Sequence, residues 1–166
     1  MHKFSVPFRI HGTGCLLIGS CVLIGVWLRG WGLGFAVGAL LVASLLMHEV
    51  GHMLVAIKLG VPVREFGLRL LGAYNRRAYA TNRRDELLIS LAGPLTNLCL
   101  AIPFLFVPAI GTQLALGNLA LCVVNLLPIP SSDGLHILQT LLHSSLPGDI
   151  TPKLGQHNSA LGNKAA

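Results

Sequence analysis

The chain has 166 residues and a mass of 17.6 kDa, and 53% of its residues are hydrophobic while only 11% are charged. A soluble domain typically carries about 25% charged residues, so this composition excludes a water-soluble globule, and the apolar content excludes a disordered chain. The net charge of +6 does not indicate a nucleic-acid partner, because most basic residues lie in one loop between apolar runs, where membrane topology explains them. We therefore predict an all-α polytopic membrane protein that contacts the lipid bilayer and binds no nucleic acid.

Four apolar segments are suited to transmembrane helices, which need about 20 mostly apolar residues. The expected spans cover residues 13–28, 32–59, 87–107 and 112–128. The last two share a stretch without a charged side chain, 87–132, in which Pro103, Pro108 and Gly111 indicate a turn. An apolar first run also describes a signal peptide, but no A-x-A-like cleavage site follows Trp27, so we expect an uncleaved span.

Three glycines recur every four residues at the start of the second span, at Gly30, Gly34 and Gly38. This spacing puts them on one helix face, where the backbone of a neighbouring helix can approach closely. We expect that neighbour to belong to the same chain, and a homodimer contact is the alternative.

The segment between the second and third spans, residues 60–86, is both basic and strand-like. Residues 61–74 are rich in Val, Leu and Phe, with glycines at positions 67 and 72. Asn75-Arg76-Arg77 is typical of a turn, and residues 78–81 could return as a strand. We predict a short membrane-associated β-hairpin here, and an irregular basic loop is the alternative.

Lys and Arg are distributed unevenly over the predicted loops. Eleven of them lie before the first span, between the second and third, or after the fourth, whereas Arg29 lies on the other side. Because basic loops stay in the cytoplasm, we expect both termini and the 60–86 loop to be cytoplasmic, in a multi-pass protein of the cell (plasma) membrane. The chain divides into an N-terminal segment with the first span (1–30), a core (31–145) and a flexible polar tail (146–166).

The motif that carries chemistry is His48-Glu49-Val50-Gly51-His52. Residues i and i+4 share a helix face, so His48 and His52 can hold one metal ion, and Glu49 beside them can take a proton from an attacking water. Acidic and basic groups near the centre of a bilayer cost at least ~2.5 kcal/mol each, and a metal ion compensates for this cost. The alternative is a pair of interfacial histidines with Glu49 in solvent.

A catalytic zinc site usually has three protein ligands and one open position. Asp133 is the best candidate for the third ligand, because it is the first charged residue after the stretch 87–132 and the predicted topology puts it at the same membrane face as His48 and His52. His136, one helical turn further along, competes with it for this role. The remaining acids lie in the basic loop or in the tail.

From about residue 32 to 142 the chain resembles the site-2 proteases, which are intramembrane zinc metalloproteases. The resemblance rests on three motifs in the expected order and spacing: HEVGH (48–52), AGPLTN (92–97) and NLLPIPSSDG (125–134). It implies a three-helix core made by the second, third and fourth spans, in a compact form without a PDZ or CBS domain. Ser131 and Ser132 depart from the family pattern, which usually has Pro-Leu before its Asp-Gly.

The resemblance also implies roles for individual residues. The ligands of one zinc ion are carried over to His48, His52 and Asp133, and the general base to Glu49. Two further residues, Asn97 and Asn125, match asparagines of the family motifs and could donate a hydrogen bond to the oxyanion or to the substrate backbone. Alternatively, they satisfy backbone groups that nearby prolines leave free.

These observations predict a zinc metalloendopeptidase that hydrolyses peptide bonds within or near transmembrane segments, as in regulated intramembrane proteolysis. The expected partners are a transmembrane protein substrate and the lipid bilayer, and a regulatory membrane partner is left open. The alternative is a non-enzymatic metal-binding membrane protein, either a transporter or a partner-binding scaffold. A closed four-ligand site that includes His136 would favour this alternative, whereas an open fourth position would favour the protease.

Overall fold

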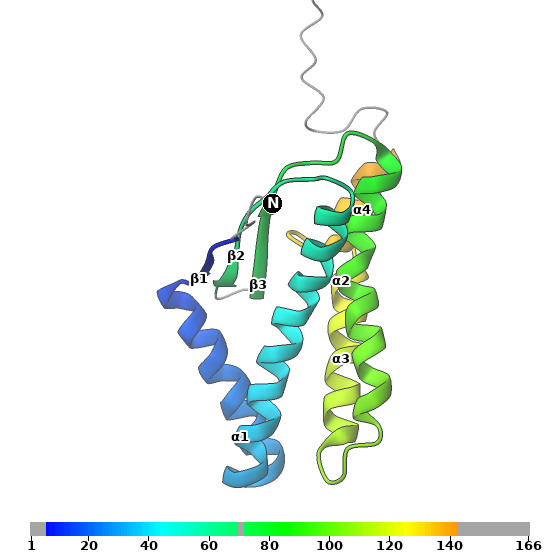
Figure 1. Cartoon of the computed structure of the whole chain (residues 1–166). Helices are drawn as coiled ribbons and strands as arrows, with labels where there is room; N and C mark the ends of the chain where they lie inside the picture. Colours follow the sequence, from blue (N-terminus) through cyan, green and yellow to red (C-terminus); the bar gives the residue numbers. More distant parts are fainter. Residues whose placement is uncertain (1–5, 70–71, 143–166) are drawn as a thin grey trace, which may run out of the picture.

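The computed structural model describes residues 6–69 and 72–142, so the predicted tail, 146–166, lies outside the described residues. Within them the chain forms a small sheet and a bundle of helices (Figure 1). The elements in chain order are β1 (Phe8–Ile10), α1 (Gly12–Lys58), β2 (Val63–Arg69), β3 (Gly72–Arg77), α2 (Arg83–Phe104), α3 (Gly111–Leu126) and α4 (Asp133–Leu142).

Helix α1 is a hairpin of two helical halves that are in contact near the break and diverge toward the sheet (Figure 1). The break falls at Gly30, whose φ of 72° is a conformation that glycine adopts without steric cost. At Gly25, Gly34 and Gly38 the two halves touch backbone to backbone, because a Cβ at any of these positions would collide with the opposite half. The predicted packing within the same chain is therefore confirmed for Gly34 and Gly38, whereas Gly30 lies at the break and is not part of this face.

The third and fourth predicted spans correspond to α2 and α3. Helix α2 begins four residues earlier than expected, because the Asn82 side chain caps it by accepting a hydrogen bond from the backbone N–H of Asp85 at 2.8 Å. Helix α2 packs against α1 and α3, and the short helix α4 returns to pack on α2. The second half of α1 and α4 thus both pack on α2, which assembles the site described below.

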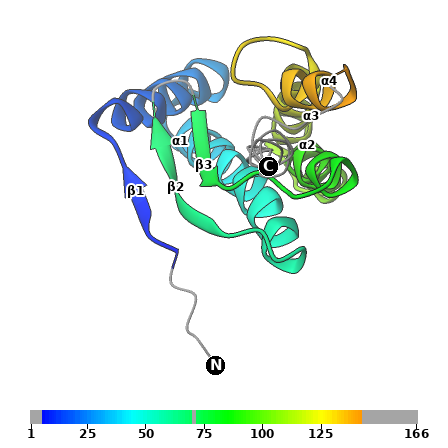
Figure 2. The ribbon, with the colours of Figure 1, turned by 90° about the horizontal axis from the view of Figure 1, so that it is seen from above.

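The sheet confirms the predicted hairpin but corrects its details. Strands β2 and β3 pair antiparallel in a register that runs from Arg69 with Gly72 to Val63 with Arg77, so the predicted turn at 75–77 and return strand at 78–81 are wrong. The polar residues of 75–77 lie in a strand because Tyr74 and Ala73 beside them pair with Gly67 and Leu68 of β2. Strand β1, which was not predicted, pairs parallel with β2 and makes β3 an edge strand. Seen from above, the sheet lies to one side of α2 and α4 (Figure 2).

The outer surfaces of α1, α2 and α3 expose large apolar side chains. By length and composition, α1 and α2 are apolar enough to cross a membrane, while α3 has 16 residues and falls short of the ~20 of a typical span. Three aromatic side chains are more than four-fifths exposed, namely those of Trp27, Trp31 and Phe106. Contiguous exposure of this kind is rare in soluble monomers.

The contact inside the α1 hairpin leads to a first prediction. Gly34→Ala should lower the free energy of unfolding by about 1–3 kcal/mol, because the new methyl group has no room between the two halves. Gly32→Ala is the matched control, since the space around Gly32 is open and alanine favours the helix. Thermal unfolding of the two variants in detergent checks this, and equal stabilities would contradict the packing.

Candidate metal centre

Helix α1 supplies three neighbouring functional side chains, all buried in the structure. The Nε2 atoms of His48 and His52 lie 3.1 Å apart. One ligand atom from each histidine and a carboxylate oxygen of Glu49 lie within 4.8 Å of one another. The local i, i+4 geometry of a helix produces this cluster without help from the rest of the fold.

Helix α4 brings a fourth group, Asp133, to the same point. Its Oδ2 lies 3.1 Å from Nε2 of His48, and its Oδ1 lies 3.2 Å from Nε2 of His52. Burial raises the pKa of Asp133, but hydrogen bonding to the two facing histidines outweighs this effect and holds the pKa at about 2. The group is therefore a carboxylate at neutral pH.

The loop before α4 aims Asp133 back at the histidines. The buried hydroxyl of Ser132 lies 2.5 and 2.7 Å from the carbonyl oxygens of Leu127 and Ile129, which share its single proton, and it accepts from the N–H of Leu135 at 3.1 Å. The hydroxyl therefore stabilises the loop and also caps the N-terminus of α4. Ser132, which departs from the family pattern, has a structural role here.

The other ring nitrogen of each histidine is held by an acceptor. Nδ1 of His52 donates to the carbonyl oxygen of Ile89 at 2.6 Å, and Nδ1 of His48 donates to Oδ1 of Asn97 at 2.9 Å. In a neutral imidazole whose proton is on Nδ1, Nε2 carries the lone pair that a metal ligand needs. Two imidazole nitrogens and one carboxylate therefore converge on a single spot, where protons or a metal cation can satisfy all three.

The spacing of these donor atoms fits zinc. Around a tetrahedral zinc with bonds of roughly 2.0–2.1 Å, neighbouring ligand atoms lie about 3.3–3.4 Å apart. The two Nε2 atoms lie 3.1 Å apart, and they lie 3.1 and 3.2 Å from the two carboxylate oxygens of Asp133, so these distances are close to this value. Two imidazoles and one carboxylate are also a donor set that catalytic zinc sites use. This centre would hold the ion through His48, His52 and Asp133.

Asn97 does not face the reaction space. It is fully buried, and its amide binds His48 on one side and donates to Oδ1 of Asn118 at 3.4 Å on the other. Asn118 in turn donates to Ser44, which lies one turn before His48. This network fixes the orientation of the His48 ring, so we reassign Asn97 from an oxyanion donor to a positioning residue.

Asn125 is also removed from the reaction space. Its amide donates to the carbonyl oxygen of Leu121 at 2.9 Å, within α3. It is not among the residues that line the cavity described next.

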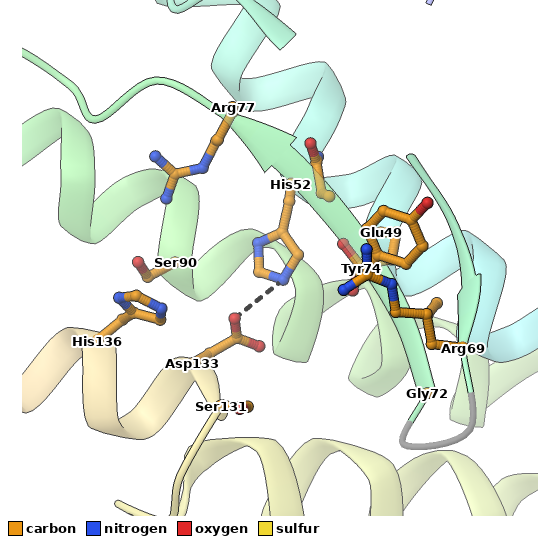
Figure 3. A pocket seen from close by; sticks show the side chains of 12 residues that line it. Glu49, His52, Arg69, Gly72, Tyr74, Arg77, Ser90, Ser131, Asp133 and His136 are labelled. Atoms are coloured by element: carbon orange, nitrogen blue, oxygen red, sulfur yellow. Dashed lines mark ion pairs between the residues drawn. The ribbon is translucent and has the colours of Figure 1, made fainter. Parts of the chain in front are cut away.

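A cavity of about 310 Å³ lies beside Glu49, His52 and Asp133 (Figure 3). Strand β3 forms the wall opposite the helices. The other residues that line it include Arg69, Tyr74, Asn75, Arg77, Ser90, Ser131 and His136. The site is therefore buried on the helix side and open to a space large enough for several peptide atoms.

An ion pair fixes β3 above this cavity. Arg77 donates through both terminal nitrogens to Glu86, at 2.9 and 2.7 Å, and Glu86 also accepts from the N–H of Ala80 at 2.8 Å. Glu86 is 1% exposed, so its charge requires these partners. The pair joins the end of β3 to the first turns of α2, and it thereby links two walls of the cavity.

Gly93 explains why α2 can lie so close to the metal centre. A Cβ at this position would collide with Nε2 of both His48 and His52. Only glycine allows the backbone of α2 to approach the ligands this closely. Sequence reasoning placed Gly93 in a motif but assigned it no role. It also missed Ser44, Ser90 and Asn118, although a polar residue inside an apolar span is the signal that could have found all three.

The H-E-x-x-H geometry of this centre can be compared with that of known proteins, and three comparisons point to the same family. The sequence model of Peptidase family M50 matches residues 36–112, which contain the first two motifs. The chain is 30% identical over 163 residues to the protein sll0528 of Synechocystis sp., covering 84% of this chain and 42% of that protein. It is 32% identical over 149 residues to zinc metalloprotease MJ0392 of Methanocaldococcus jannaschii, and this match covers 82% of this chain and 43% of that protein.

The fold is similar to that of the solved site-2 protease from Methanocaldococcus jannaschii. The TM-score is 0.69 at 27% identity, over 86% of this chain and 69% of that chain. The matches to Peptidase family M50, to the two relatives above and to this solved site-2 protease confirm the resemblance predicted from the three motifs. The chain spans less than half the length of the curated relatives named above.

The close approach at Gly93 gives a second prediction. Gly93→Ala should lower zinc affinity by about tenfold or more, because the methyl group pushes the two ligand rings apart. Competition with a zinc chelator of known affinity measures this effect. Gly19→Ala is the control, since the space around Gly19 on α1 is open. If the folded Gly93 variant bound zinc as tightly as the wild type, the proposed ligand geometry would be wrong.

Proposed function

We propose that this chain is an intramembrane zinc metalloendopeptidase that hydrolyses peptide bonds within or near transmembrane segments of membrane proteins, as in regulated intramembrane proteolysis. The observation that carries the proposal is the convergence of His48, His52 and Asp133, with Glu49 alongside, at the edge of a cavity between apolar helices. The proposal extends to the whole protein the activity for which its relative MJ0392 is named.

In this mechanism zinc would act as a Lewis acid that polarises the scissile carbonyl and makes the attacking water more acidic. Glu49 takes the proton of that water and later delivers it to the nitrogen of the leaving amine. The buried position of Glu49, at 9% exposure, keeps competing water away from this proton transfer. Asn97 and the carbonyl of Ile89 hold the two ligand rings in place throughout.

Strand β3 offers a surface for an extended peptide. It is the edge strand of the sheet within the described residues, and it lines the cavity beside the metal centre. The enclosed side-chain amide of Asn75 has no hydrogen-bond partner among the residues that the structure describes. A substrate helix must unwind before attack, and an unwound segment added along β3 by β-augmentation would gain main-chain hydrogen bonds. This supports a peptide as the substrate.

We propose four membrane spans, with the α1 hairpin providing two, and with residues 31–145 forming the catalytic core. Trp27 and Trp31 flank the α1 turn, and Phe106 lies in the α2–α3 connection, at the same end of the helices (Figure 1). The basic sheet and the start of α2 lie at the other end, which we assign to the cytoplasm of a cell (plasma) membrane protein with cytoplasmic termini.

The orientation gives a third prediction. In intact cells a membrane-impermeant maleimide should label Arg29→Cys, whereas Arg84→Cys should be labelled only after the membrane is permeabilised. Both arginines are exposed, so accessibility does not distinguish them. The chain without an added cysteine sets the background from its four native cysteines. The reverse labelling pattern would invert the topology.

The fourth prediction tests the activity. Glu49→Gln should reduce cleavage of a co-expressed single-span membrane protein by at least about 10²-fold, because the amide cannot accept the proton of water. Zinc content should stay near one per chain, since Glu49 is not among the proposed ligands. Glu65→Gln, on strand β2, is the matched control and should cleave normally. Full cleavage by the Glu49 variant would favour the non-enzymatic alternative, a metal-binding transporter or scaffold.

A further inference from the structure

Ser90 has an unusual hydroxyl. It lies inside α2, is 2% exposed, and lines the cavity at the metal centre. Hydroxyls inside helices commonly donate to the carbonyl four residues earlier. That bond is made by Ser20, Ser44, Thr96 and Thr140. The Ser90 hydroxyl makes no such bond and has no hydrogen-bond partner among the described residues, so it is free to bind a group that enters the cavity.

The imidazole of His136 is a second free group on the same cavity. No described residue hydrogen-bonds to its ring, and its one ring neighbour is Tyr79, with centroids 6.5 Å apart. His136 follows Asp133 by three residues on α4, so both side chains project from the same helix face. His136 therefore faces the reaction space without being needed to hold Asp133.

The antiparallel packing of α2 and α4 brings these two groups to one level. The start of α2 meets the end of α4, where Arg83 donates to the carbonyl of Leu141 at 3.0 Å. Ser90 lies three residues before Gly93, which touches the ligand rings, and His136 lies three residues after Asp133. Each is thus displaced by about 4.5 Å along its helix from the metal centre, in the same direction.

Figure 3 shows Ser90 and His136 next to each other on one side of the His52–Asp133 pair, with Glu49 on the other side. A hydrolytic site needs the proton acceptor for water and the hydrogen-bond donors for the carbonyl oxygen on different sides of the reacting carbon. The cavity has this arrangement, with Glu49 as the proton acceptor on one side and Ser90 and His136 as the donors on the other.

We propose that Ser90 and His136 form the oxyanion-binding pair of this site, donating hydrogen bonds to the oxygen of the peptide carbonyl that Glu49-activated water attacks. The inference rests on the proposed protease function and assigns the role that Asn97 and Asn125 cannot fill. A serine hydroxyl and a neutral imidazole each carry one donor, so no change of protonation is required. Pro94, which lacks an N–H, also leaves the carbonyl of Ser90 without its helical donor and able to accept from a substrate amide.

The test uses the full chain in lipid nanodiscs with the single-span substrate described above. Ser90→Ala and His136→Ala should each lower kcat by about 10²-fold, with KM within roughly twofold of the wild type, because these bonds strengthen only as charge develops on the oxygen. His136→Gln, which keeps an N–H donor, should recover part of the activity. Ser20→Ala is the matched control, since its hydroxyl is exposed and bonded within α1.

Two readouts separate this role from others. Zinc content should remain near one per chain in the Ser90 and His136 variants but fall in Asp133→Ala; loss of zinc in His136→Ala would make His136 a ligand and overturn the inference. A phosphinic peptide, which mimics the tetrahedral centre, should bind each alanine variant more weakly, in parallel with the loss in kcat.

Unchanged kcat, or a rise in KM alone, would also overturn the inference while leaving the protease function intact. If wild type and Glu49→Gln cleaved equally, the protease function itself would fail. The phosphinic peptide would then decide on the oxyanion pair, because equal affinity for wild type and Ser90→Ala would exclude it.

Discussion

The structure depends on the convergence of two imidazole nitrogens and one carboxylate in an apolar setting. Nε2 of His48, Nε2 of His52 and the carboxylate of Asp133 lie within 3.2 Å of one another, and both imidazoles are fixed by acceptors at Nδ1. In a low-dielectric environment, polar groups that converge in this way must satisfy one another or hold a cation. A bound zinc ion would tie α1 to α4.

Small residues allow the helices to come close enough for the ligands of α1 and α4 to meet. Gly93 lets the backbone of α2 touch both ligand rings, Gly51 lets α1 approach Ala92 of α2, and Gly34 closes the α1 hairpin. Lipid gives helices no hydrophobic reason to associate, so close backbone contact and buried hydrogen bonds must hold them together. The network from Ser44 through Asn118 to Asn97 does this and ends on the Nδ1 atom of His48. Bundle packing and ligand orientation therefore share the same residues.

The sheet lies outside the helix bundle, and its main contribution is to the candidate site rather than to the core of the bundle. Arg77 and Glu86 fasten β3 to the start of α2 and so set the width of the cavity. Strand β1 pairs on the far side of β2, which leaves the edge of β3 available next to the metal centre. The fold thus places the free edge of β3 and the candidate metal centre at the same cavity, which Ser90 and His136 also line.

The sequence by itself determined what depends on local spacing. Helical periodicity puts His48, Glu49 and His52 on one turn, apolar length outlines the spans, and a four-residue glycine repeat marks a close helix contact. Only the tertiary structure decided which distant groups meet. It brought Asp133 to the histidines, turned Asn97 away from the cavity, moved the hairpin turn ahead of Gly72 and added β1. These outcomes depend on how α2 and α4 pack and on strand pairing across more than fifty residues, and no local pattern encodes such contacts.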